Sequence, residues 1–167
     1  MAEESRERFL PDEPGLVLVY EESFDGGDLG ESRLEVLSLE KKEGGELLSL
    51  RRVRGEEETI EEYRLDSRGA WKTSPEGEEL IWEYPVEESE WTEEDPRVGS
   101  IHFRRFFGEP VEVAGQRFER VLTLTSDSEG GQSLKYFAPR IGLLKSSYLA
   151  DGTPGERILK EIRRSKV

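Results

Sequence analysis

The sequence predicts an all-β protein, folded as an antiparallel meander that forms a barrel or half-barrel with little helix. Two patterns lead to this prediction. Short runs of strand-forming residues recur along the chain, and clusters of Gly, Pro and Asp separate them at nearly regular intervals. Counting these runs gives about ten strands, as expected of a meander with hairpin connections. With 167 residues and 34% hydrophobic content, the chain suits one domain, residues 10–167, after a charged and frayed N-terminus at residues 1–9.

In the first half, Pro11 precedes an apolar run that reads as the first strand. Glycine-rich turns follow, the longest at residues 25–30. Residues 59–66 fit either a strand or a short helix, and their Thr, Ile and Tyr favour a strand. The strands expected in this half span residues 16–24, 33–42, 46–56, 59–66, 70–73 and 79–86.

Residues 87–98 interrupt this pattern, because acidic residues and proline surround Trp91. We expect a surface loop or a short helix starting at Thr92, and helix nowhere else except the last turn of the chain. The glycine-rich link at 151–155 favours a terminal hairpin over a C-terminal helix. The strands expected in this half span residues 100–113 with a bend at 108–110, 117–126, 136–150 with a turn inside, and 156–164, and a hairpin turn is expected at Ala114-Gly115.

Residues 136–145 are the stretch least diluted by charge, and they read as strand, tight turn and strand. Tyr136 and Phe137 favour a strand, and Pro139 sets φ for the first corner of a turn. Because Arg140 carries a Cβ atom, we expect a type I turn with negative φ at that residue.

This stretch, Tyr136-Phe137-Ala138-Pro139-Arg140-Ile141-Gly142-Leu143-Leu144-Lys145, resembles the closing signature of a family of uncharacterised bacterial β-proteins. The family signature is Tyr-aromatic-Ala-Pro-Gly-Val-Gly-Leu-Val-Lys, and Arg140 stands at its first glycine. Residues 111–118 resemble the family's Val-x-Val-Pro-Ala-Gly-Thr-Phe, and residues 11–20 resemble its opening. The family is often exported or lipid-anchored. The resemblance implies a β fold, and a location outside the cytoplasm if a signal peptide has been removed; as the sequence stands, we expect a cytoplasmic protein.

The chain is strongly acidic, with 38 acidic against 24 basic residues and a net charge of −14. This charge argues against nucleic acid or an anionic membrane as a partner and is typical of a well-solvated surface. No apolar window is long enough to span a bilayer as a helix. The absence of cysteine excludes disulfides and thiolate sites, and the abundance of Glu, Arg and Leu with a single Met resembles a thermophile's composition.

No catalytic constellation, metal site or cofactor motif is present, so we expect neither an enzyme nor a cofactor. The single histidine, His102, is expected to face solvent or a neighbouring carboxylate from within a strand. Asp25, Asp28 and Glu31 do not have the spacing of a calcium loop. The competing function is a hydrolase that pairs carboxylates such as those of residues 56–58 and 61–62, although a run of acidic residues usually forms a solvated face.

Large aromatic residues are concentrated in the middle of the chain. They can fill the interior of a small barrel, or they can line a groove for an apolar ligand, and the sequence leaves both readings open. We expect a non-enzymatic binding or structural module, with a carrier of lipid or another apolar small molecule as the alternative, acting as a monomer or homodimer. Trp91 is expected to fold over the mouth of a partly open barrel. The candidate ligand-binding residues are Trp71, Trp82, Tyr84, Trp91, Phe103 and Phe106.

Overall fold

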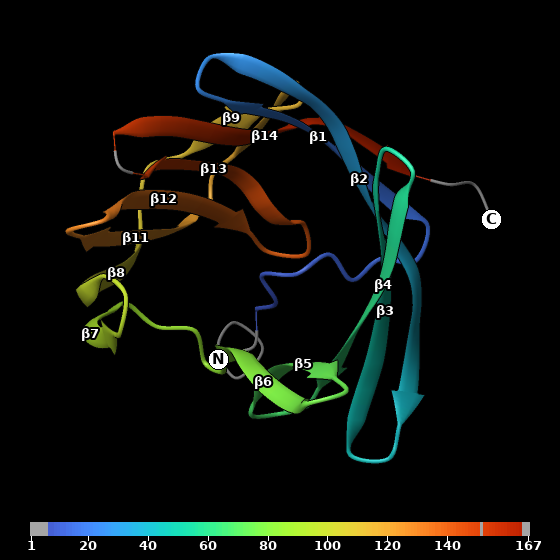
Figure 1. Cartoon of the computed structure of the whole chain (residues 1–167). Coiled ribbons are helices and arrows are strands. Elements are labelled where there is room, and N and C mark those ends of the chain that lie inside the picture. Colours follow the sequence, from blue (N-terminus) through green and yellow to red (C-terminus); the bar gives the residue numbers. More distant parts are fainter. Residues whose placement is uncertain (1–6, 151, 165–167) are drawn as a thin grey trace.

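A computed structural model describes residues 7–150 and 152–164, and every regular element among them is a β-strand (Figure 1). The predicted excess of strand over helix is therefore confirmed. The strands are β1 (Leu16–Phe24), β2 (Gly27–Lys42), β3 (Gly45–Arg54), β4 (Glu57–Leu65), β5 (Gly69–Ser74), β6 (Gly77–Glu83), β7 (Ser89–Asp95), β8 (Gly99–Phe107), β9 (Val111–Val113), β10 (Gln116–Phe118), β11 (Leu122–Ser128), β12 (Gly131–Ala138), β13 (Gly142–Ala150) and β14 (Thr153–Arg164).

Twelve of these strands form one antiparallel sheet in the order β6-β5-β4-β3-β2-β1-β14-β13-β12-β11-β8-β7. The sheet curls strongly, but β6 and β7 lie at its two ends and do not pair with each other (Figure 1). The architecture is thus an open half-barrel, as the sequence predicts. The remaining strands, β9 and β10, form a separate hairpin whose turn is Ala114-Gly115, also as predicted.

The segment expected to be a loop or short helix instead contains β7, so the helix prediction there is wrong. Its residues pair with β8 along their whole length. The Trp91 ring stacks on Phe103, with 5.2 Å between ring centroids, and the Glu90 carboxylate lies 2.7 Å from the His102 Nε2. These cross-strand pairs and the ladder hydrogen bonds come from a partner strand, and they outweigh the local preference of an acidic segment.

The turn between β12 and β13 also differs from the prediction. Arg140 has φ of 67°, and the Ile141 amide donates to the Ala138 carbonyl at 3.3 Å, which together describe a type II turn and not type I. The Arg140 amide donates to the Arg8 carbonyl at 2.7 Å, and its Nε donates to Asp12 Oδ1 at 3.0 Å. Contacts with the N-terminal segment therefore hold Arg140 in a backbone region that residues with a Cβ atom seldom adopt.

That N-terminal segment passes through the space that the sheet encloses (Figure 1). Residues 1–6 lie outside the described part of the chain. The sequence places Phe9 in a frayed terminus, whereas the structure buries Phe9 completely. The segment is a core element, because its apolar side chains meet the inner face of the sheet.

Phe9 joins the two halves of the half-barrel through an aromatic cluster. Its ring centroid lies 5.7 Å from that of Trp82 in β6 and 6.2 Å from that of Phe107 in β8. Trp82 in turn meets Phe137 of β12 edge-on, at 5.1 Å. We name these four residues, Phe9, Trp82, Phe107 and Phe137, the aromatic bridge. The bridge connects strands from opposite parts of a sheet whose ends do not pair.

The left-handed Arg140 leads to a first prediction. Arg140→Gly is expected to be about 1 kcal/mol more stable than Arg140→Ala, because glycine adopts positive φ without the Cβ penalty. Both variants lose the Asp12 ion pair, so the comparison isolates the backbone. Urea denaturation measures the difference. At Arg163, a strand residue without positive φ, the order should reverse, and equal stabilities at position 140 would contradict the turn described here.

The aromatic bridge leads to a second prediction. Phe9→Ala is expected to lower the free energy of unfolding by about 3–5 kcal/mol, because it removes a fully buried ring at the junction of two sheet halves. Phe24, which is 40% exposed, provides the control: Phe24→Ala should cost about 1 kcal/mol or less. A Phe9→Ala loss no larger than that of the control would show that the N-terminal segment does not support the core.

Candidate functional site

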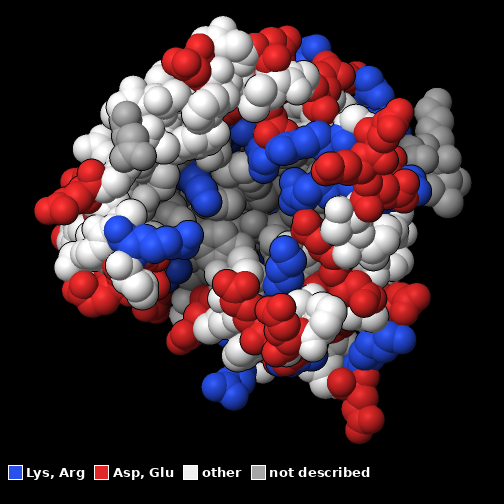
Figure 2. Space-filling view, viewed as in Figure 1, with Lys and Arg blue, Asp and Glu red and all other residues white. Residues whose placement is uncertain are grey.

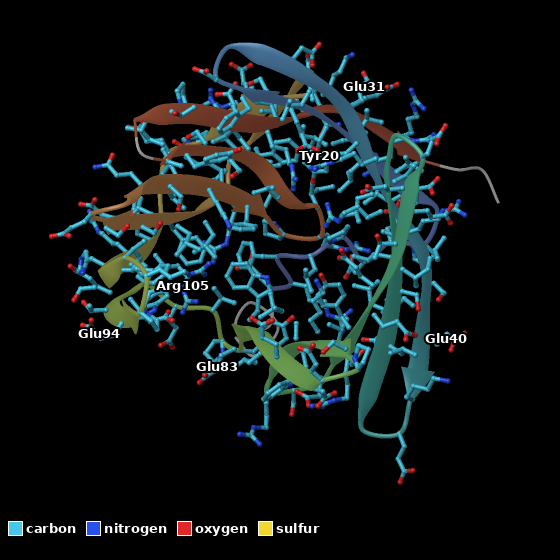
Figure 3. All side chains as sticks on the ribbon, viewed as in Figure 1. Tyr20, Glu31, Glu40, Glu83, Glu94 and Arg105 are labelled. Carbon is cyan, nitrogen blue, oxygen red and sulfur yellow. The ribbon has the colours of Figure 1, made fainter. Side chains whose placement is uncertain are left out.

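Beside the aromatic bridge, the inner side of the half-barrel contains a cavity of about 480 Å³. This volume falls in the range of roughly 300–1,000 Å³ that is common for small-molecule sites. Apolar side chains from both halves of the sheet line it, among them Leu34, Leu50, Leu124 and Leu143. We name it the inner cavity. Figure 3 shows Tyr20 and Arg105, which both line it, on the side that the sheet encloses, whereas Glu31 and Glu40 lie on the outer side.

Cationic side chains cross the inner face beside this cavity in one row. Strand register pairs Arg105 with Leu124, Leu124 with Lys135, Lys135 with Ser146, and Ser146 with Arg157. Directly paired residues of neighbouring strands project to the same face of a sheet. We name Arg105, Lys135 and Arg157 the cationic row. Figure 2 shows basic side chains in the hollowed centre of this face and acidic ones around its margin.

One member of the row is neutralised by a carboxylate. Arg157 donates to Glu22 Oε1 at 3.2 Å, and Arg54 donates to the same oxygen. Burial alone would favour the neutral acid, but the Ser32 hydroxyl and the two arginines hold the pKa of Glu22 below its usual range. Glu22 and Arg157 therefore form a fixed charge pair at one end of the row.

The other two members have no such partner. Neither Arg105 nor Lys135 forms an ion pair with any residue that the structure describes. Arg105 donates from Nε to the Glu87 carbonyl at 2.9 Å, and its guanidinium lies 5.5 Å from the centroid of the Trp91 ring. Burial lowers the pKa of Arg105, and the nearby charges of Glu83 and Glu87 offset this effect only in part.

On the opposite wall, polar groups satisfy one another. Arg52 donates from Nε to Glu61 at 2.9 Å, and the Tyr63 hydroxyl donates to the same carboxylate at 3.0 Å. Burial opposes charge on Glu61, but these bonds and the Arg52 charge keep its pKa below the usual range. Closer to the cationic row, the Tyr20 hydroxyl of β1 donates to the Leu143 carbonyl of β13 at 2.6 Å. Arg52, Glu61 and Tyr63 thus form a closed wall network, in which each side chain has a hydrogen-bond partner. By contrast, Arg105 and Lys135 in the cationic row form no ion pair with a described residue.

Next to the inner cavity, on the side of Lys135 and Arg157, the inner face has two further hollows with polar linings. Lys135 and Arg157 line both the inner cavity and an adjoining hollow of about 500 Å³ that also contains Ser133 and Ser146. A larger hollow of about 720 Å³ continues toward the ends of β11 to β14, and its lining includes no Lys or Arg. The cationic row therefore stands at the boundary between an apolar cavity and a polar one.

The six residues singled out from the sequence divide between the two faces of the sheet. Trp82 and Trp91 line the inner cavity, and Phe103 stacks on Trp91. Tyr84 packs beside the core at a separate hollow, and burial raises its pKa to about 12. Trp71 and Phe106 are on the outer face, where Arg64 and Arg104 respectively cover their rings. The structure thus brings together three of the six.

The sequence reading missed the residues that complete the site. The sequence predicts Phe106 as a ligand-binding residue, whereas Phe107 faces the interior, and this difference of one residue changes the face of the strand. Because side chains alternate between the faces of a sheet, Phe103, Arg105 and Phe107 share one face of β8. In the same way, Ser133, Lys135 and Phe137 share one face of β12. A cation between inward-facing aromatic residues was the available signal. The missed residues are Phe9, Arg105, Phe107, Lys135, Phe137 and Arg157.

His102 is exposed and meets Glu90 and Thr92 on the outer face of β8, as expected of a strand histidine near a carboxylate. Within residues 7–150 and 152–164, no three His, Asp or Glu side chains are placed to hold a metal ion. In the same part of the chain, no helix has the length and apolar character needed to cross a bilayer.

Comparison with known proteins shows a shared fold. No protein-family profile and no curated protein sequence matches this chain. A crystal structure of a candidate lipoprotein from Parabacteroides distasonis superposes with a TM-score of 0.61 at 12% identity, covering 94% of this chain and 99% of the other. One of a candidate exported protein with a YmcC-like fold from Bacteroides fragilis superposes with a TM-score of 0.61 at 10% identity, covering 95% and 100%. At these identities, the likeness extends to the fold alone.

The closed wall network leads to a prediction about pH. The folded state lowers the pKa of Glu61, so the stability that this residue contributes is present at neutral pH and is lost as pH falls through the folded pKa. Glu61→Gln is expected to cost about 1–2 kcal/mol at pH 7, and the gap to the parent protein should narrow as pH falls below the ordinary glutamate pKa of about 4.3 and through the lower folded pKa. Urea denaturation from pH 7 to pH 3 measures this. A gap that stays constant over that range would contradict a charge-dependent contact with Arg52.

Proposed function

We propose that this protein is a non-enzymatic binding module whose inner cavity takes an apolar small molecule. The observation that carries the proposal is the cavity itself, about 480 Å³ of space enclosed between leucine side chains and the aromatic bridge. A purely structural module would be expected to fill this space, because protein interiors are packed almost as densely as organic crystals. An open half-barrel leaves its inner face available to a ligand, and apolar cavities with a few polar groups are the common form of a ligand site.

The wall chemistry supports binding over catalysis. A general acid at neutral pH needs a raised carboxyl pKa. Glu22 and Glu61 have lowered values, because arginines hold both as carboxylates. These two residues fit a structural role in shaping the cavity, in contrast to the paired carboxylates that a hydrolase would need.

We further propose that the chain belongs to the family of exported or lipid-anchored β-proteins that its residues 136–145 resemble. The fold shared with a candidate lipoprotein and a candidate exported protein supports this assignment and favours a role outside the cytoplasm.

The test is binding of Nile red, an uncharged dye that fluoresces in apolar surroundings, to protein purified without detergent. We expect saturable binding with one dye per chain. Leu124→Trp, which places a larger side chain at the cavity wall, should weaken binding at least tenfold. Ile60→Trp is the matched control, since Ile60 is exposed on the outer face of β4, and it should leave binding unchanged. A protein that does not bind the dye, and that native mass spectrometry shows to carry no ligand, would favour the purely structural function.

A further inference from the structure

We propose that the ligand is a single-chain amphiphile with one anionic head group, a carboxylate or a phosphate monoester, whose tail enters the inner cavity and whose head binds Lys135 and Arg105. This inference rests on the proposed function and specifies the ligand's chemistry.

The position of Lys135 fits the charged group of an amphiphile. Lys135 lines both the apolar inner cavity and the polar hollow next to it, so its side chain lies where apolar surroundings give way to polar ones. Its direct strand neighbours on the inner face are Leu124 on one side and Ser146 on the other, which repeats the same change of polarity. An amphiphile has this division along its length, with an apolar tail on one side of the charged group and solvent on the other.

The balance of charge on the inner face favours an anionic ligand. The chain has 38 acidic and 24 basic residues, so carboxylates are in excess. Even so, Arg105 and Lys135 face the interior without an ion pair among the described residues, while Arg157 in the same row is neutralised by Glu22. Arg105 is half-buried, and the nearby charges of Glu83 and Glu87 offset the cost of its desolvation only in part, so an anion bound beside it would lower that cost further. Lys135 is exposed to the hollow and would add a second positive charge beside the anion. An uncharged apolar ligand would leave the cost in place.

The contacts of Arg105 orient its guanidinium for an anionic head group. The Arg105 guanidinium uses its Nε to bind the Glu87 carbonyl and lies near the Trp91 ring, which fixes its orientation. No described residue accepts a hydrogen bond from its terminal nitrogens, which are suited to the oxygens of a carboxylate or phosphate. Lys135 can supply a second, flexible donor, so two cations flank the place of the head group.

The experiment compares ligands that share one ten-carbon chain and differ in the head: decanoate, decyl phosphate, decanol and decyltrimethylammonium, each tested by displacement of Nile red below its micelle concentration. Decanoate and decyl phosphate are expected to bind about tenfold or more tightly than decanol. Inorganic phosphate alone should not displace the dye or shift the melting temperature, and the two anionic ligands together distinguish the two kinds of head group.

Variants assign the effect to the row. Lys135→Met keeps the apolar stem but removes the charge, and it should weaken both anionic ligands about tenfold while leaving decanol unchanged. Lys135→Glu should reverse the preference and favour decyltrimethylammonium. Lys41→Met is the matched control, because Lys41 is an exposed lysine outside both hollows, and it should behave as the parent protein. Thermal melts establish that each variant is folded.

The outcomes separate this inference from the proposed function. If decanol binds as tightly as decanoate and Lys135→Met has no effect, the anionic head group is wrong while apolar binding stands. If inorganic phosphate binds as well as decyl phosphate, the site takes free anions and the amphiphile is wrong. If neither Nile red nor any ten-carbon ligand binds, the proposed function fails, and this inference fails with it.

Discussion

The structure depends on one constraint: a curled sheet with unpaired ends must cover its own inner face. A closed barrel would do so by joining its first and last strands, but here β6 and β7 remain apart. The chain instead passes its N-terminal segment through the enclosed space, where Phe9 contacts Trp82 and Phe107. Because this solution needs only one segment, it fills part of the interior and leaves the rest as the inner cavity. The same contacts account for Arg140, since the Arg8 carbonyl and Asp12 hold its backbone at positive φ.

Most of the fold could be predicted, because its determinants are local. Glycine-rich turns fix where the chain reverses, and a meander joins mostly sequential neighbours, so strand order follows from the turns. The failures are non-local. The segment of β7 is acidic and looks irregular until β8 supplies partners, and Phe9 looks like part of a terminal tail until the sheet curls around it. No window of sequence records that the two ends of a sheet approach each other, so the aromatic bridge could not be predicted from patterns alone.

The site shows a finer limit. The sequence suggested that mid-chain aromatics either fill a core or line a groove, and the structure contains both arrangements: Trp82 belongs to the bridge and also borders the cavity. Successive side chains of a strand point to opposite faces of the sheet, so an aromatic residue faces inward only at every second position. A shift of one residue exchanges Phe106 for Phe107, and the same alternation places Arg105 inside. Charged residues were read as surface because most of them are, yet the informative ones are the few that alternation places among inward-facing aromatics.

The acidic exterior and the cationic row together affect which anions can reach the interior. A net charge of −14 repels extended polyanions along their whole length, in line with the expectation that nucleic acid is not a partner. For a ligand with one charge the repulsion is weak, since salt screens it beyond about 8 Å at physiological ionic strength. Once inside, the proposed ligand meets the half-buried Arg105, where attraction between opposite charges is stronger than in water, and the more exposed Lys135 beside it. For the proposed ligand, an acidic exterior around the cationic row therefore favours an anion with a single charge and an apolar body.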